Sequence, residues 1–225
     1  IDREPGKTTK MAIVTAVETS QVRVEVEGER LWLEELGLQH LEDYHELWSS
    51  PETLIWSGQT VKKTLEESKA FMLQGLRAAK PDNDQFCLMV SPDPIAKEPN
   101  LKPKMIGVIG VIRKGDDGYE FGYTINHRYW KRGYGAKMLQ LFAGKEGAYW
   151  ALEHRKDVPH LVACVDTENF VSSRLVTKLG ARRADKILVK AYGLGRDKGP
   201  DGIVPEEKMR DLITFYIDRP GIISP

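Results

Sequence analysis

The sequence is poor in cysteine and has no excess of either charge. Cys87 and Cys164 are the only two cysteines among 225 residues. Both lie in apolar runs typical of buried strands, so we expect two reduced thiols and a reducing compartment such as the cytoplasm. Lys plus Arg and Asp plus Glu both number 33, and no run approaches the ~18 apolar residues of a membrane span. We therefore expect neither nucleic acid nor a membrane as partner.

The histidines lack the spacing of a metal site. There are only five of them. His40 and His45 are the closest pair, and a separation of five does not place both on one helical face. The sequence predicts no metal. The five are His40, His45, His127, His154 and His160.

Composition and length indicate one globular domain. Hydrophobic residues make up 41% of the chain and charged residues 29%, which is ordinary for such a domain. We interpret residues 1–20 as an N-terminal arm, some of which could be foreign to the native chain, and residues 21–225 as a single domain. Residues 91–104, with four prolines, and residues 193–205 read as loop insertions, and residues 193–201 of the second, rich in glycine and charge, are expected to be mobile.

The pattern of apolar residues predicts an α/β fold of the mixed α+β kind, with helices on both faces of a mixed sheet. Alternation, β-branched runs and turn residues predict strands, and apolar spacing of three to four predicts helices. The expected strands are 22–26, 30–34, 86–90, 105–112, 119–125, 161–165, 184–192 and 212–217. The expected helices are 38–48, 60–78, 133–154 and 170–179, the second burying Val61, Leu65, Phe71, Met72 and Leu76.

The junction from Asn126 to Ala136, between a buried strand and a helix, has the features of an anion site. The first amides of a helix lack internal partners, and the helix dipole favours negative charge there. Gly133 and Gly135 would let a diphosphate approach the backbone. Arg128, Lys131, Arg132 and Lys137 add local positive charge. The alternative is a glycine-flanked helix start with solvated basic side chains. Neither the dinucleotide fingerprint nor a P-loop ending is present.

A second motif follows, and with the first it resembles a known family. Glu120–Tyr123 reads Glu-Phe-Gly-Tyr, Tyr129–Gly135 reads Tyr-Trp-Lys-Arg-Gly-Tyr-Gly, Asn169–Ser172 reads Asn-Phe-Val-Ser, and Lys178–Gly180 reads Lys-Leu-Gly. These segments resemble the GNAT acyltransferase superfamily, in the branch of the ribosomal-protein N-terminal acetyltransferases. The match runs from about Arg30 to Ala181.

The resemblance implies a fold and an activity. The implied GNAT fold has a central twisted mixed sheet of about seven strands, splayed at its two central parallel strands. The implied activity is direct transfer of an acetyl group from acetyl-CoA to a primary amine in a ternary complex, by a monomer or homodimer. Ala181 replaces the family's usual aromatic residue, and Val176 stands where several relatives place a tyrosine that protonates the departing thiolate.

The resemblance also implies a set of donor-binding residues. Pantetheine would run along the strand backbone like an added strand, and a freed strand amide could polarise the thioester carbonyl. Asn169 would hold pantetheine through its side-chain amide, and Ser172 would steady or protonate the thiolate, unless it is only a first-turn hydroxyl. The diphosphate maps to Lys131, Arg132, Gly133, Tyr134, Gly135 and Ala136, and the pantetheine strand to Tyr123, Thr124 and Ile125.

Candidates on the acceptor side each have a structural alternative. An α-amine needs only about 1 kcal/mol for deprotonation at pH 7, whereas a lysine amine needs about 4.6 kcal/mol. Glu120, beside the implied acetyl site, is the candidate general base, or else a carboxylate paired across the hairpin. Trp56 and Ser57 fall where the family builds its acceptor pocket, although Trp56 could equally belong to the core.

Two other functions stay open at this point. The acceptor could be a small metabolite or xenobiotic amine instead of a protein N-terminus. The chain could also be a non-catalytic acyl-CoA-binding module, an alternative that the missing tyrosine favours.

Overall fold

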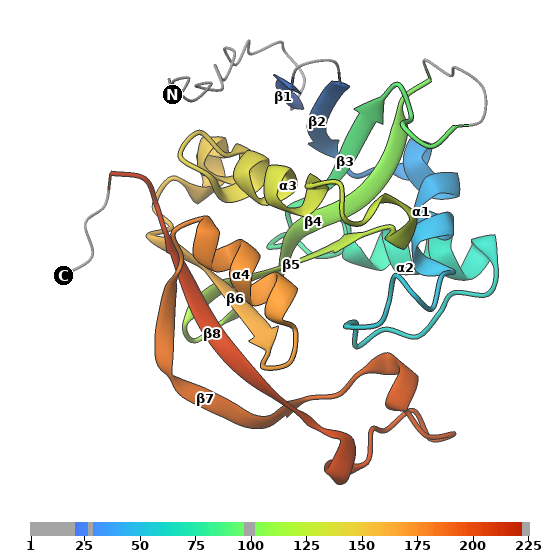
Figure 1. The fold of residues 1–225 in the computed structure, drawn as a ribbon, viewed down its shortest axis with the longest axis vertical. Helices are drawn as coiled ribbons and strands as arrows, with labels where there is room; N and C mark the ends of the chain where they lie inside the picture. Colours follow the sequence, from blue (N-terminus) through green and yellow to red (C-terminus); the bar gives the residue numbers. More distant parts are fainter. Residues whose placement is uncertain (1–20, 27–28, 97–101, 222–225) are drawn as a thin grey trace, which may run out of the picture.

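The computed structural model describes residues 21–26, 29–96 and 102–221 (Figure 1). The predicted arm of residues 1–20 lies outside the described residues, and so do residues 97–101 of the first predicted insertion. Both cysteines are free thiols on strands, as expected, although Cys164 is only partly buried.

A mixed sheet organises the chain, in the order β1-β2-β3-β4-β5-β6-β8-β7. Every neighbouring pair is antiparallel except β5 and β6, which are parallel. The described strands number eight, one for each range that the apolar pattern predicted, whereas the family resemblance implied about seven. They are β1 (Gln21–Val26), β2 (Glu29–Glu35), β3 (Gln85–Ser91), β4 (Lys104–Gly115), β5 (Gly118–Ile125), β6 (His160–Asp166), β7 (Arg182–Tyr192) and β8 (Arg210–Asp218).

Helices cover both faces of the sheet, as predicted. Helices α3 (Tyr134–Ala143) and α4 (Phe170–Lys178) pack over one face, where the larger core cluster joins them to strands β2 to β6 and β8. Helices α1 (Leu41–Trp48) and α2 (Leu65–Gly75) cover β2, β3 and β4 on the other face. Short 3-10 helices fill the connections: η1 (Leu38–His40), η2 (His127–Tyr129), η3 (Ala148–Ala151), η4 (Glu153–Arg155), η5 (Gly195–Asp197) and η6 (Glu206–Lys208).

Helix α2 is shorter than predicted. Thr64 fixes its start, because the Thr64 side chain accepts a hydrogen bond from the amide of Glu67. Leu76 has left the helical conformation, with ψ of 153°. The prediction that Leu65 is buried is wrong, since the Leu65 side chain is 40% exposed at the first turn. Met72 is fully buried as predicted.

Helix α3 ends at Ala143, eleven residues before the predicted end. Gly144 is extended, and the amide of Gly147 donates to its carbonyl, which closes a turn. A Cβ on Gly147 would lie 2.4 Å from the carbonyl oxygen of Phe142, so this close turn requires glycine. The apolar residues that follow form η3 and η4 instead of further α-helix.

A buried ion pair joins the start of β3 to η4. Arg155 donates from Nε to Oδ2 of Asp84 over 2.7 Å, and both side chains are at most 4% exposed. His154 lies 2.9 Å from the other oxygen of Asp84, and Arg155 also donates to the carbonyl of Asp82. Burial opposes the charge on Arg155, but the hydrogen bond and attraction to Asp84 outweigh it and raise the Arg155 pKa. Removal of either side chain would therefore leave the other as a buried charge without this partner, which is destabilising.

Candidate functional site

The two parallel strands separate after a short contact. Strands β5 and β6 pair only at Tyr119 with Leu161 and at Glu120 with Val162. Beyond these pairs, β5 continues to Ile125 beside β4, and β6 continues to Asp166 beside β8. The backbone of β5 from Phe121 onward thus has one edge without a partner strand among the described residues. This is the splay that the resemblance implied, and it offers an edge for strand addition.

The start of α3 adjoins this open edge. Its N-cap residue is Gly133, which has no side chain to cap the helix, and the first turn carries no acidic residue. Gly133, at the N-cap position, has φ of +80°, and Lys131 has φ of +62°. Such left-handed backbone in a non-glycine residue is uncommon and clusters at functional sites. The start of α3 therefore has the backbone geometry and dipole that favour an anion, with the exposed side chains of Lys131 and Arg132 nearby in the chain.

The two glycines of this junction have different roles. An added Cβ on Gly133 would meet no atom within 4 Å, so glycine is needed there for its conformation. An added Cβ on Gly135 would lie 3.1 Å from Cδ1 of Leu175 on α4. The expectation that Gly135 admits a diphosphate is thus joined by a second reason for glycine, the close packing of α3 on α4. Tyr134 is 2% exposed and can offer a ligand only its backbone.

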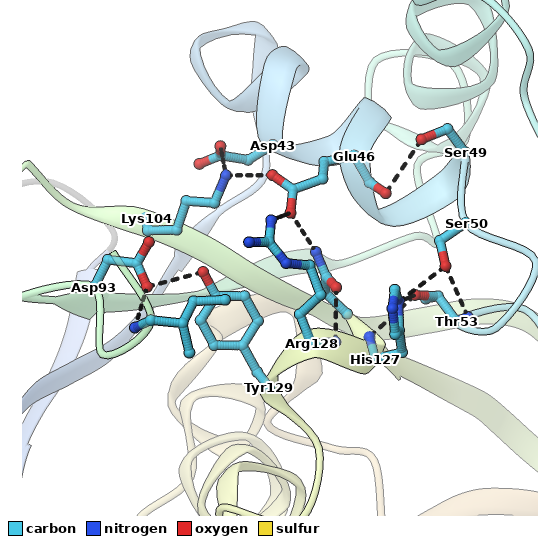
Figure 2. Close-up of polar contacts among 12 residues, drawn as sticks. Asp43, Glu46, Ser49, Ser50, Thr53, Asp93, Lys104, His127, Arg128 and Tyr129 are labelled. Atoms are coloured by element: carbon cyan, nitrogen blue, oxygen red, sulfur yellow. Dashed lines mark hydrogen bonds and ion pairs between the residues drawn. The ribbon is translucent and has the colours of Figure 1, made fainter. Parts of the chain in front are cut away.

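A polar cluster ties helix α1 to the loop that leads into α3 (Figure 2). Oε1 of Glu46 accepts from Asn126 Nδ2 and from Arg128, each over 3.0 Å, and Oε2 accepts from Lys104 Nζ over 2.6 Å. Burial opposes the charge on Glu46, but these hydrogen bonds together lower its pKa. The His127 amide donates to Thr53 Oγ1 over 3.1 Å. The loop before α3 is thus held from two points of the α1 region.

The start of α4 meets the face of β5 that α3 and α4 cover. The side-chain oxygen of Asn169 accepts from the amide of Ser172 over 3.0 Å and caps the helix. Oγ of Ser172 lies 2.9 Å from the hydroxyl of Tyr123, and either group could donate. Burial raises the pKa of Tyr123, which keeps its hydroxyl protonated. Two predicted site residues from distant segments therefore form one hydroxyl pair.

Glu120 lies on the opposite face of the sheet from Tyr123, because side chains alternate along a strand. Its Oε2 accepts from Arg113 Nε over 2.7 Å, and the Glu120 carboxylate raises the pKa of Arg113. Burial raises the pKa of Cys164 to about 11, and Glu120 adds to this effect. The pairing across the hairpin that was the structural alternative for Glu120 is therefore present, on the face where Cys164 lies.

Trp56 and Ser57 belong to a loop, residues 55–59, that is hydrogen-bonded to the connection between β7 and β8. The Ser57 carbonyl accepts from the amide of Gly195 over 2.8 Å, and Arg196 donates to the Ile55 carbonyl over 2.6 Å. Trp56 is partly exposed and belongs to neither core cluster. The segment predicted to be mobile is instead packed against this loop, since a Cβ on Gly195 would lie 2.0 Å from the carbonyl oxygen of Gln59.

Tyr192 is a site residue that the sequence did not single out. Its hydroxyl accepts a hydrogen bond from the amide of Gly58, 134 residues away in the chain. Burial raises the Tyr192 pKa, the bond from Gly58 opposes the rise, and the Glu120 carboxylate reinforces it. Tyr192 therefore lies between these two hydrogen-bonded loops and the face of the sheet that carries Glu120. No local pattern signals a contact over this separation.

One cluster outside this site has the residue types of a metal centre. Ligand atoms of Glu34, His40 and Cys87 lie within 4.8 Å of one another. Nδ1 of His40 accepts from the amide of Gly37, so Nε2 carries the proton that faces Glu34 Oε1 over 2.6 Å. A metal-bound histidine needs a lone pair on one nitrogen and a proton on the other. The donated amide at Nδ1 opposes that arrangement, and we assign no metal to this cluster.

Comparisons with known proteins place the chain in a family. Within the described ranges, no helix has the length and apolar character needed to cross a membrane. A comparison with curated proteins finds no significant relative. Among solved structures, a GNAT-family acetyltransferase from Bacillus anthracis superposes with a TM-score of 0.61 at 18% identity, covering 88% of this chain and 98% of that one.

Two further structures carry specific names. Spermidine N-acetyltransferase from Vibrio cholerae, in complex with CoA and spermine, has a TM-score of 0.61 at 15% identity, covering 84% of this chain and 95% of that one. RimL, a ribosomal L7/L12 alpha-N-protein acetyltransferase in complex with coenzyme A, has a TM-score of 0.60 at 14% identity, covering 89% and 99%. The family model for the acetyltransferase (GNAT) domain matches residues 30–182, more than half of the chain. The chain therefore belongs to the GNAT acetyltransferase family.

Proposed function

We propose that this acetyltransferase moves an acetyl group from acetyl-CoA to a primary amine by direct transfer. The observation that carries the proposal is the meeting of three features: the open edge of β5, the start of α3 with its glycine N-cap, and the Ser172–Tyr123 pair. A diphosphate needs amides and positive charge, and a thioester carbonyl needs a fixed donor beside it. All three lie at the end of β5.

The donor fits this arrangement residue by residue. The amides from Lys131 to Ala136 would take the diphosphate, and the edge of Tyr123, Thr124 and Ile125 would pair with pantetheine. The side-chain oxygen of Asn169 already accepts the hydrogen bond that caps α4, so Nδ2 would donate to a pantetheine carbonyl. Ser172, supported by Tyr123, would donate to the departing thiolate in place of the tyrosine that Val176 replaces.

The acceptor would approach from the other face, where Glu120 lies. A water beside Glu120 would take a proton from the ammonium group, the neutral amine would attack the thioester carbon, and a β5 amide would stabilise the oxyanion. Collapse of the intermediate would break the C–S bond, the CoA thiolate would leave with a hydrogen bond from Ser172, and the second proton on nitrogen would pass to water. Glu120 accepts from Arg113, and we propose that it acts as the general base through water. An α-amine needs less help to lose its proton at pH 7 than a lysine-like amine does. We therefore propose a protein N-terminus as acceptor, as in the ribosomal-protein branch.

Calorimetric titration with acetyl-CoA, and separately with NADH and ATP, tests the donor. We expect micromolar binding of acetyl-CoA alone. Gly133→Val should weaken this binding about tenfold or more, because a β-branched residue resists φ of +80° and the first amides would turn away.

Gly180→Val is the matched control. Gly180 also has positive φ and open space around a Cβ, but it ends α4. It should lose stability while acetyl-CoA affinity stays unchanged. Equal loss of affinity in both variants, or no binding to the wild type, would refute the donor site. Binding without turnover on a panel of peptides, polyamines and small amines would instead support a non-catalytic module. Turnover on small amines alone would refute the N-terminal acceptor.

Glu120→Gln tests the general base. The amide keeps the shape of the side chain and can still accept from Arg113. We expect kcat to fall about tenfold at pH 7 and less at pH 9, where more of an α-amine is already neutral, with acetyl-CoA affinity unchanged. The measurement is a pH–rate profile with a peptide acceptor. Arg113→Gln serves as control, and equal losses of activity in both variants would mark the pair as structural only.

A further inference from the structure

A groove lies on the far side of α4 from α3. It has a volume of about 690 Å³ and opens between α4 and the strands β7 and β8. Leu175 and Val176 face α3 and the core, whereas Phe170, Arg174 and Lys178 face the groove. Figure 1 shows that β7 and β8 form a long hairpin at the edge of the molecule. The groove is thus separate from the proposed donor site.

The groove is apolar and partly open. Ile213 and Phe215 of β8 are buried at its base. Phe170 of α4 is 71% exposed and Ile187 of β7 is 41% exposed, although both are large apolar side chains. Val171 and Val189, on the same two elements, are exposed as well. Large exposed apolar side chains at a groove are a feature of interaction sites.

The ionisable side chains that line the groove all carry positive charge. They are Arg174, Lys178 and Arg183. Within the part of the chain that the structure describes, these three make no ion pair, whereas other cations of the same hairpin do. Arg182 pairs with Asp218, and Arg210 pairs with Asp166. The positive charge of the groove is therefore uncompensated in a chain whose formal net charge is zero.

We propose that this groove binds an acidic peptide segment that carries a large apolar side chain. The apolar base would accept that side chain, and the three cations would pair with carboxylates beside it. A second copy of this chain fits less well, because a symmetric contact would bring the same cations together. The charge and the apolar base together define the partner.

The test uses fluorescence anisotropy with the full chain saturated with acetyl-CoA. The probe is a labelled decapeptide in which Asp and Glu alternate with Leu and Phe, compared with its Lys-substituted counterpart. We expect saturable binding of the acidic probe only, weakened by salt and weakened at least about tenfold by Arg174→Glu with Lys178→Glu. Lys145→Glu, the same charge change outside the groove, should leave the affinity unchanged.

Three outcomes would overturn the proposal. The first is no saturable binding of the acidic probe below about 1 mM. The second is a charge-reversed variant that still binds the probe but loses affinity for acetyl-CoA, which would assign the cations to the donor's phosphates. The third is a dimer, seen by sedimentation, that Phe170→Glu abolishes, which would assign the surface to a second copy. A folded Arg174→Glu, Lys178→Glu variant, checked by its unfolding transition, keeps the test decisive.

Discussion

Arg155→Met is expected to lower the free energy of unfolding by about 3–5 kcal/mol, measured by denaturant titration. Methionine fills a similar volume, but it has no charge to pair with Asp84. The Asp84 side chain is only 2% exposed and would lose the guanidinium of Arg155. Asp84 then keeps His154, at 2.9 Å, and the half-exposed Arg77, at 3.7 Å, but loss of the buried guanidinium from a buried ion pair is costly. The variant also loses the bond to the Asp82 carbonyl and the contact with the Tyr119 ring, 4.2 Å from the guanidinium carbon.

Arg182→Met is the matched control for this prediction. Arg182 makes two hydrogen bonds to Asp218, but its side chain is 53% exposed. Exposed pairs contribute little because water and salt screen them. We expect the unfolding midpoint of this variant to stay near the wild type. If the two variants shift the midpoint alike, His154 and Arg77 suffice to hold Asp84, and the pair with Arg155 is dispensable.

Ser172→Ala is expected to lower kcat by about 100-fold with little change in acetyl-CoA affinity, because the departing thiolate loses its donor. The measurement is steady-state kinetics beside a binding titration. Tyr123→Phe should lower kcat less, by about tenfold, since Ser172 keeps its hydroxyl but loses the 2.9 Å partner that orients it. The double variant should be no worse than Ser172→Ala, because the two hydroxyls act as one unit.

Ser173→Ala is the control beside it. The Ser173 hydroxyl is buried and makes no hydrogen bond within the described residues, so its removal should change neither kcat nor stability appreciably. If Ser172→Ala also retains full activity, the thiolate is protonated by water, and the hydroxyl pair is only a helix-start feature.

The sequence predicted those parts of the fold that depend on neighbouring residues. Alternation at Val22–Val26, the β-branched run at Met105–Ile112 and the glycine that ends α4 all predicted elements that the structure confirms. The ends of α2 and α3 were wrong, because the Thr64 cap and the Gly144–Gly147 turn outweighed apolar spacing that continued past them.

The residues of the candidate site also divide into those that neighbouring residues predict and those that depend on distant contacts. Gly133 and the Asn169 cap are local features of a helix start, and the sequence motif contained both. The Tyr123–Ser172 pair and the bond from Gly58 to Tyr192 join residues far apart in the chain. Contacts of this range depend on how the sheet folds, so residue spacing carried no sign of Tyr192. The resemblance supplied Ser172 as a candidate, but not its partner.

The close packing of residues 55–59 against the β7–β8 connection has a consequence for engineering this acetyltransferase. A Cβ on Gly58 would lie 2.9 Å from the Tyr192 hydroxyl, and a Cβ on Gly195 would lie 2.0 Å from the carbonyl oxygen of Gln59. Both positions therefore require a residue without a side chain. A loop graft that replaces one segment would bring a new main-chain path against an unaltered neighbour, and the two would collide or part. The two segments therefore behave as one unit, and loop chimeras should take both from one parent, although more than a hundred residues separate them.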